Sequence, residues 1–289
     1  MSELRLERPS DVDAFIHVAG EFLLEHEAEN CLPLGIADSI RAGDYAEAYF
    51  AIVRDGDTIV GAALRTPPFN VLLSVPFAVD AMPRLADDLF GIAPDLRGVG
   101  AEVSAARAFA ERWTARTGTV ARRQMAERIF RLEGVIAPRP VGGSMRVAGA
   151  GDRGLLAAWL RAFAEEALGE RTDEVSGLRV ADRWLAAQRR RMYVWEDGRP
   201  VSIVGVSGET PHGIRVAPVY TPPELRGRGY ASALTAAVSQ AQLDNGRRYC
   251  FLFTDLANPT SNKIYRAVGY EPVCDVDDLR FEVPAAADT

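Results

Sequence analysis

The sequence contains few of the cysteine and histidine residues that metal sites and disulfide frameworks require. Among its 289 residues only three are cysteines, Cys31, Cys250 and Cys274, and only three are histidines. The cysteines are odd in number and far apart, so they give neither a disulfide framework nor a metal-ligand spacing. So few imidazoles also disfavour a histidine-based metal site. We therefore expect a protein that binds no metal.

The sequence also lacks a long apolar run and an excess of basic residues. No segment approaches the roughly 20 apolar residues of a membrane span, and residues 1–15 contain no apolar signal-peptide core. The net charge is −7, whereas proteins that bind nucleic acids usually present a basic surface. Because 48% of the residues are hydrophobic, the chain can bury a core. We expect a cytoplasmic globular protein with neither a membrane nor a nucleic acid as partner.

Two stretches of the chain resemble each other. Residues 92–112 (IAPDLRGVGAEVSAARAFAER) and residues 220–240 (YTPPELRGRGYASALTAAVSQ) both place Leu-Arg-Gly-x-Gly before an alanine-rich helical pattern. Three pairs of landmarks keep the same order in both halves: Asp55-Gly56 with Asp197-Gly198, Pro94 with Pro223, and Phe130 with Tyr265. This order predicts two copies of one fold, each of about 140 residues.

Each copy shows the same succession of patterns. A helical periodicity near the start is followed by two apolar runs around an Asp-Gly turn, which predicts a helix and then a β-hairpin. In the second copy, GIRVAPVY predicts the strand before the Gly-rich loop. The nearly unbroken apolar run YCFLFTD (residues 249–255) predicts a central strand that is buried on both faces.

The second Gly-rich loop has the properties of an anion site. A strand, a Gly-rich turn and a helix N-terminus together offer free backbone N–H groups and a favourable helix dipole. Gly227 and Gly229 would allow close approach of a ligand, and Arg226 and Arg228 add positive charge. The loop is no Walker A motif because no Lys-Ser/Thr follows, and it is no dinucleotide fingerprint because Ser232 stands in place of the third glycine.

Two motifs of the second half resemble the GNAT family, the Gcn5-related N-acetyltransferases. VYTPPELRGRGYA carries the family's Arg/Gln-x-x-Gly-x-Gly/Ala loop as Arg226, Gly229 and Ala231. ANPTSNKIYRAVGYEPV carries its Asn, Tyr and Gly-aromatic pattern as Asn258, Tyr265 and Gly269-Tyr270. The resemblance extends over about 145–282. It implies an α/β (α+β) fold of two tandem GNAT-like domains, residues 1–140 and 144–284, each a mixed, mostly antiparallel sheet flanked by helices.

The resemblance also implies an acetyl-CoA site in the second domain. The loop N–H groups would hold the pyrophosphate, the strand before the loop would pair with the pantetheine arm, Asn258 would lie near that arm, and Tyr265 would protonate the leaving thiolate. The residues implied at the cofactor are Val219, Tyr220, Thr221, Arg226, Gly227, Arg228, Gly229, Tyr230, Ala231, Asn258 and Tyr265.

The general base and the role of the first copy are less sharply defined. Glu209 is the base that we select, with His212, Asp255 or a water relay as alternatives. In the first copy the landmarks align Glu102 with Ala231 and Phe130 with Tyr265. A carboxylate facing the diphosphate would repel it, and a phenylalanine carries no proton to donate. We expect residues 1–140 to be a degenerate domain without an intact cofactor site.

The sequence thus predicts an acetyl-CoA-dependent N-acetyltransferase. It would transfer the acetyl group directly to a primary amine of a small molecule or peptide. The alternative is a non-catalytic acyl-CoA-binding or sensing module. The acceptor's identity and the oligomeric state, monomer or homodimer, stay open.

Overall fold

The computed structural model describes residues 3–284, which form two compact units. The first unit contains the chain up to Ile129 and again from Val273, and the second contains Phe130–Pro272. This grouping differs from the predicted ranges 1–140 and 144–284 in two places: residues 130–140 group with the second unit, and the residues from Val273 onward group with the first. No helix among residues 3–284 is long and apolar enough to cross a bilayer.

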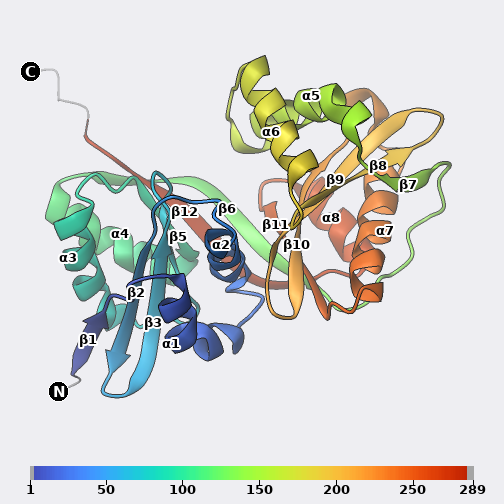
Figure 1. The fold of residues 1–289 in the computed structure, drawn as a ribbon. Helices are drawn as coiled ribbons and strands as arrows, with labels where there is room; N and C mark the ends of the chain where they lie inside the picture. Colours follow the sequence, from blue (N-terminus) through green and yellow to red (C-terminus); the bar gives the residue numbers. More distant parts are fainter. Residues whose placement is uncertain (1–2, 285–289) are drawn as a thin grey trace, which may run out of the picture. The chain divides into compact units, whose positions relative to one another are not determined.

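The first unit is a mixed sheet with two pairs of helices (Figure 1). Its strands follow the order β1-β2-β3-β4-β5-β12, with β6 next to β12, and β4–β5 is a parallel pair. The antiparallel pairing of β12 with β5 sets Leu279 opposite Val99. The elements are β1 (Leu4–Glu7), α1 (Val12–Leu24), α2 (Cys31–Arg41), β2 (Tyr49–Asp55), β3 (Thr58–Arg65), β4 (Val71–Leu73), α3 (Met82–Ile92), β5 (Gly98–Glu102), α4 (Val103–Thr117), β6 (Val120–Leu132) and β12 (Glu271–Glu282).

The second unit repeats this plan. Its strands follow the order β11-β10-β9-β8-β7, and only β10 and β11 pair in parallel among the pairings recorded for it. Helices α5 and α6 cover one face of this sheet, and α7 and α8 cover the other (Figure 1). The elements are β7 (Ser144–Val147), α5 (Arg153–Phe163), α6 (Glu174–Ala186), β8 (Arg191–Glu196), β9 (Pro200–Glu209), β10 (Gly213–Tyr220), α7 (Tyr230–Asp244), β11 (Tyr249–Asp255) and α8 (Pro259–Val268).

The predicted fold class is confirmed: the sheet is mixed and mostly antiparallel, and helices flank it in both units. Both predicted hairpins are present, as β2–β3 around Asp55-Gly56 and as β8–β9 around Asp197-Gly198. In both halves the order of elements is hairpin, strand, helix, parallel strand, helix, strand. The first landmark of the repeat is therefore correct.

The other two landmarks are wrong. Residues 98–102 of the first Leu-Arg-Gly-x-Gly stretch are strand β5, the counterpart of β11, whereas the second stretch is the loop that enters α7. Gly227 and Gly229 have positive φ, whereas Gly98 has not; a Cβ at Gly98 would lie 2.1 Å from the Leu279 carbonyl oxygen. The same local sequence thus serves close strand packing in one unit and a turn in the other.

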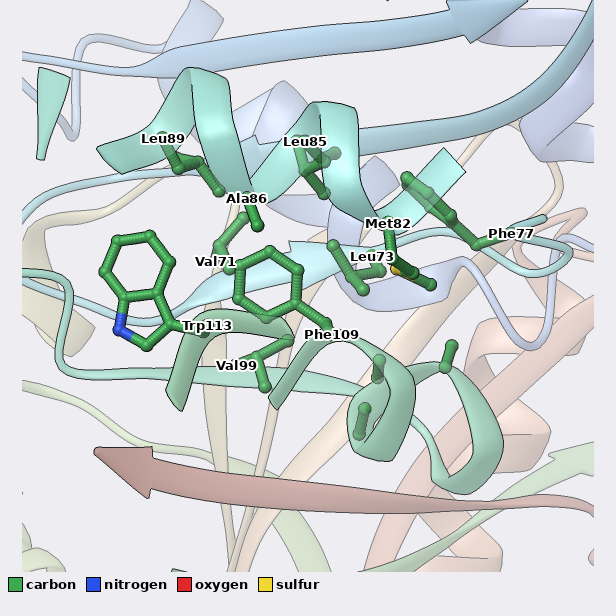
Figure 2. Close-up of a cluster of buried hydrophobic side chains, with 14 of the residues drawn as sticks. Val71, Leu73, Phe77, Met82, Leu85, Ala86, Leu89, Val99, Phe109 and Trp113 are labelled. Carbon is green, nitrogen blue, oxygen red and sulfur yellow. The ribbon is translucent and has the colours of Figure 1, made fainter. Parts of the chain in front are cut away.

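The true counterpart of the loop before α7 is the segment 74–81, which enters α3. It contains no glycine, and Phe77 within it is buried in the core of the first unit. Figure 2 shows Phe77 and Met82 beside Leu73, with Phe109 and Trp113 of α4 packed below α3. A hydrophobic core therefore occupies the place at which the second unit presents a glycine turn.

Candidate active site

The loop between β10 and α7 ends in a helix N-terminus that no side chain caps. Gly227 and Gly229 have φ of +76° and +87°, a left-handed backbone that other residues adopt at a cost. Gly229 is the N-cap of α7, without a side-chain capping hydrogen bond and without an acidic residue in the first turn. No hydrogen bond among residues 3–284 uses the backbone N–H groups of residues 227–232. These unused donors and the helix dipole create a site for an anion.

The two arginines of the loop have different surroundings. Arg228 is exposed, and its Nη2 donates to the Glu224 carbonyl at 3.2 Å. Arg226 instead braces the loop: its Nε donates to the Thr221 carbonyl at 2.9 Å, and its Nη2 pairs with Glu166. Glu166 lies in a π-helical turn, Ala164–Leu168, that follows α5. Sequence reasoning missed Glu166, because one acid in an acidic segment carries no signal of its own.

Strands β10 and β11 separate before they reach the loop. Their parallel pairing covers Gly213 to Arg215 on β10, although β10 continues to Tyr220 and β11 to Asp255. Beyond Arg215 the two strands therefore leave a wedge between them. Of the predicted strand residues, Val219 is half-buried, while Tyr220 and Thr221 are buried and bonded to Glu166 and Ser202. The backbone of β10 along the wedge is what remains for an extended ligand.

Tyr265 and Asn258 come from α8 and its N-cap. The side chain of Tyr265 is 8% exposed, and its ring contacts Tyr270 edge-on at 5.9 Å. Its hydroxyl makes no hydrogen bond within residues 3–284. Burial raises the pKa of Tyr265 well above its usual value, so the phenol stays protonated at neutral pH. Asn258 caps α8 by accepting from Ser261 N at 3.1 Å.

One unit thus combines the loop, the end of β10 and Tyr265. Tyr265 shares a buried cluster with Leu234 of α7 and Val216 of β10, and Val219 packs against that cluster. The second unit therefore contains a loop suited to an anion, a stretch of β10 that does not pair with β11, and the protonated phenol of Tyr265.

A comparison with models of protein families finds a match within the second unit. Residues 156–270 match the model of the Acetyltransferase (GNAT) family. The chain contains a GNAT domain. No curated protein matches the chain in sequence.

Solved structures extend this likeness to the whole chain. The tandem GNAT protein from the clavulanic acid biosynthesis pathway is 16% identical, with a TM-score of 0.56 over 98% of this chain and 100% of that one. A GCN5-related N-acetyltransferase from Sphaerobacter thermophilus is 17% identical, with a TM-score of 0.59 over 99% and 98%. A Drosophila protein is 13% identical, with a TM-score of 0.64 over 99% and 100%. At these identities the likeness shows that the chain has a tandem GNAT fold.

Glu209, the predicted base of the GNAT domain, lies away from the other predicted residues. It ends β9, pairs with Arg247 and faces Ile214 near the start of β10, whereas the loop follows the other end of β10. Together with Arg191, His212 and Arg247 it lines a cavity of about 370 Å³. Of the alternatives, Asp255 accepts from Ala257 N at 2.8 Å. The structure brings together the predicted cofactor residues and the predicted acid Tyr265, and it does not bring Glu209 to them.

The remaining residues of the loop lie at the first turn of α7. The hydroxyl of Tyr230 donates to Asp197 at 2.7 Å, and this hydrogen bond raises the pKa of Tyr230 above its usual value. Ala231 contributes one of the unused N–H groups. The side chain of Tyr230 is therefore engaged, while its backbone N–H is one of the unused donors of the loop.

The first unit offers no comparable arrangement among its described residues. In the segment 74–81, the N–H of Val75 donates to Asn30 at 2.8 Å, and that of Ala78 donates to the Val60 carbonyl at 2.8 Å. Glu102, expected to face a diphosphate, instead caps α4 and is the counterpart of Asn258. Seven residues after each cap stand Phe109 and Tyr265, so the phenylalanine that matches the acid is Phe109 and not Phe130.

Proposed function

We propose that the protein is an acetyl-CoA-dependent N-acetyltransferase with one cofactor site per chain, in the second unit. The observation that carries the proposal is the row of unused N–H groups at residues 227–232 beside the wedge between β10 and β11. A diphosphate needs several donors at short range, and a helix N-terminus supplies them. The residues present therefore fit the anionic part of coenzyme A.

The acetyl group arrives as a thioester when acetyl-CoA is bound. The N–H groups of residues 227–232 would hold the diphosphate, and the backbone of β10 around Val219 would orient the pantetheine arm. The bound thioester would supply an electrophilic carbonyl carbon, with which the acceptor's free amine would form a C–N bond as the C–S bond breaks. Tyr265 donates its proton to the leaving sulfur, because its buried phenol stays neutral. Water would take the proton that the amine loses and return one to Tyr265, so that the phenol is restored.

A single cofactor site follows from the contrast between the units. The segment 74–81 already uses its N–H groups of Val75 and Ala78, and Phe77 fills the space in front of α3. We expect titration calorimetry with acetyl-CoA to give a stoichiometry of one per chain. Two equivalent sites would contradict the proposal.

The activity itself is tested with a panel of primary amines. Free thiol released from acetyl-CoA is measured with a thiol-reactive dye for amino acids, polyamines, aminoglycosides and peptides, each against a reaction without amine. Release that depends on one class of amine supports the proposal. Binding of acetyl-CoA without release for any amine would favour the acyl-CoA-binding module instead.

A further inference from the structure

Arg215 lies where β10 and β11 begin to separate. It is the last residue of β10 that pairs with β11, opposite Phe251. Its neighbours Ile214 and Val216 belong to the buried cluster beneath α7 and α8. Since side chains alternate along a strand, Arg215 points to the opposite face, the face of α5 and α6. It therefore lies at the closed end of the wedge, on the side away from α7.

A β-bulge makes room for this guanidinium. Ile214 is paired with Glu209 and Arg215 with Ser207, so Gly208 is an extra residue on β9. Gly208 has a φ of +66°, and a Cβ there would lie 3.4 Å from the Arg215 guanidinium carbon. Bulges of this kind redirect side chains next to functional sites. At this bulge the Arg215 guanidinium lies next to the backbone of Gly208, which has no side chain in its way.

The guanidinium has a donor without an acceptor. Nη1 of Arg215 is buried, and it has no hydrogen-bond partner among residues 3–284. The residue as a whole is half-buried, but a buried guanidinium nitrogen without an acceptor is costly, so a ligand or water is expected as its partner. Ser207 stands directly across the sheet on the same face and adds a hydroxyl.

The positions next to Arg215 on the same face are occupied by small residues. Gly205 of β9 lies on the same face and carries no side chain. A Cβ at Gly205 would lie 2.7 Å from the Trp184 ring of α6. Ala217, two residues after Arg215, is half-buried and small. Arg215 thus brings an unmet cationic donor to a face of β9 and β10 whose neighbouring positions carry small residues, with Trp184 of α6 over Gly205.

We propose that Arg215 binds a carboxylate of the acetyl acceptor, so that the acceptor is a small amine that carries a carboxylate, as an amino acid does. This inference rests on the proposed function, because it places the acceptor at the closed end of the wedge that would hold the thioester. A guanidinium matches the planar, two-oxygen geometry of a carboxylate. Ser207 is a second donor to the same group.

The test compares matched amines in the full-length protein. Each amino acid is paired with its carboxamide, which keeps the shape and removes the charge, and kcat/KM is measured for wild type, Arg215→Gln and Arg215→Lys. Arg248→Gln is the control, since Arg248 stacks on Tyr249 outside the wedge. We expect wild type to prefer the acids over the amides by about tenfold or more, as a charge-assisted hydrogen bond provides.

The variants separate binding from folding. Arg215→Gln should abolish the preference through KM for the acids and leave the amides unchanged, Arg215→Lys should retain part of it, and Arg248→Gln should retain all of it. Equal use of acids and amides by wild type would overturn the inference, and so would an equal loss for both in Arg215→Gln. A preference for phosphoethanolamine over every carboxylate would overturn the carboxylate assignment.

A binding measurement distinguishes this inference from the proposed function. Calorimetry follows amino acids binding to protein saturated with coenzyme A. If no amine releases thiol but amino acids bind wild type and not Arg215→Gln, the acceptor site stands and the acetyltransferase proposal fails. If thiol is released yet amino acids neither bind nor react better than their amides, the inference fails and the acetyltransferase stands. If no amine reacts and none binds, both fail.

Discussion

At the scale of single residues, Tyr265 combines a buried ring with a hydroxyl that no neighbouring residue uses. The ring is fixed by Tyr270 and by the cluster beneath α7 and α8, while the hydroxyl stays available to a ligand. Burial alone accounts for the raised pKa, because no charged group acts on it. This is the state that a proton donor to a thiolate needs.

We expect Tyr265→Phe to lower kcat by about a hundredfold or more, the range of general acid catalysis, with little change in acetyl-CoA affinity. Steady-state kinetics and calorimetry measure the two quantities, and Tyr249→Phe, outside the wedge, is the control. An unchanged kcat would exclude Tyr265 as the acid.

The pH dependence tests the same residue. Because burial raises its pKa, Tyr265 loses its proton only above the usual tyrosine value of about 10, so it should cause no fall in kcat up to that pH. A decrease in kcat between about pH 8 and 9 that disappears in Tyr265→Phe would show that its pKa is not raised.

At the scale of elements, α7 has two ends with the same glycine geometry and different roles. Gly227 precedes the helix with a φ of +76°, and Gly246 follows it with a φ of +87°; a Cβ at either would meet no atom within 4 Å. A substitution at either position therefore strains the backbone without a steric clash. Substitutions at Gly227 and Gly246 therefore carry the same backbone cost, and only the one at Gly227 also changes the loop before α7.

We expect Gly227→Ala and Gly246→Ala each to lower the free energy of unfolding by about 1 kcal/mol, the cost of a left-handed alanine. Only Gly227→Ala should weaken acetyl-CoA binding, because it shifts the N–H groups of the loop. Denaturant unfolding and calorimetry measure both effects. Equal affinities of the two variants would mean that this loop does not hold the cofactor.

At the scale of the whole molecule, the last strand of each half contributes to the other unit. β12 pairs with β5 and buries Leu279 in the first unit, where Phe281 contacts Trp113 at 5.8 Å. β6 ends at Leu132, and Phe130 and Leu132 lie in the core of the second unit. The halves of the sequence are therefore not the same as the compact units of the structure.

We expect a chain that ends at Pro272 to lose the stability of the first unit, because β5 would lose its antiparallel partner and the core would lose Leu279. A chain that ends at Pro284 is the control. Limited proteolysis with mass spectrometry should show early cleavage within residues 3–129 of the shorter chain only. Cleavage that begins within residues 144–272 would instead support the sequence-based boundary.

The sequence by itself determined the local features that depend on neighbouring residues. The hairpins at Asp55-Gly56 and Asp197-Gly198, the buried strand 249–255 and the glycine turn before α7 all follow from turn chemistry and periodicity, which act over a few residues. The two GNAT motifs likewise indicated the family whose model matches residues 156–270, because each motif is continuous in sequence.

Only the tertiary structure decided what the repeated Leu-Arg-Gly-x-Gly sequence becomes. Its backbone is left-handed at Gly227 but extended in β5, because Leu279 of the last strand packs against Gly98. It also decided that Glu209 pairs with Arg247, that Glu166 holds Arg226 and that Arg215 keeps an unmet donor at the closed end of the wedge. These are contacts between residues far apart in the chain, and local sequence carries no information about which partner a side chain will meet.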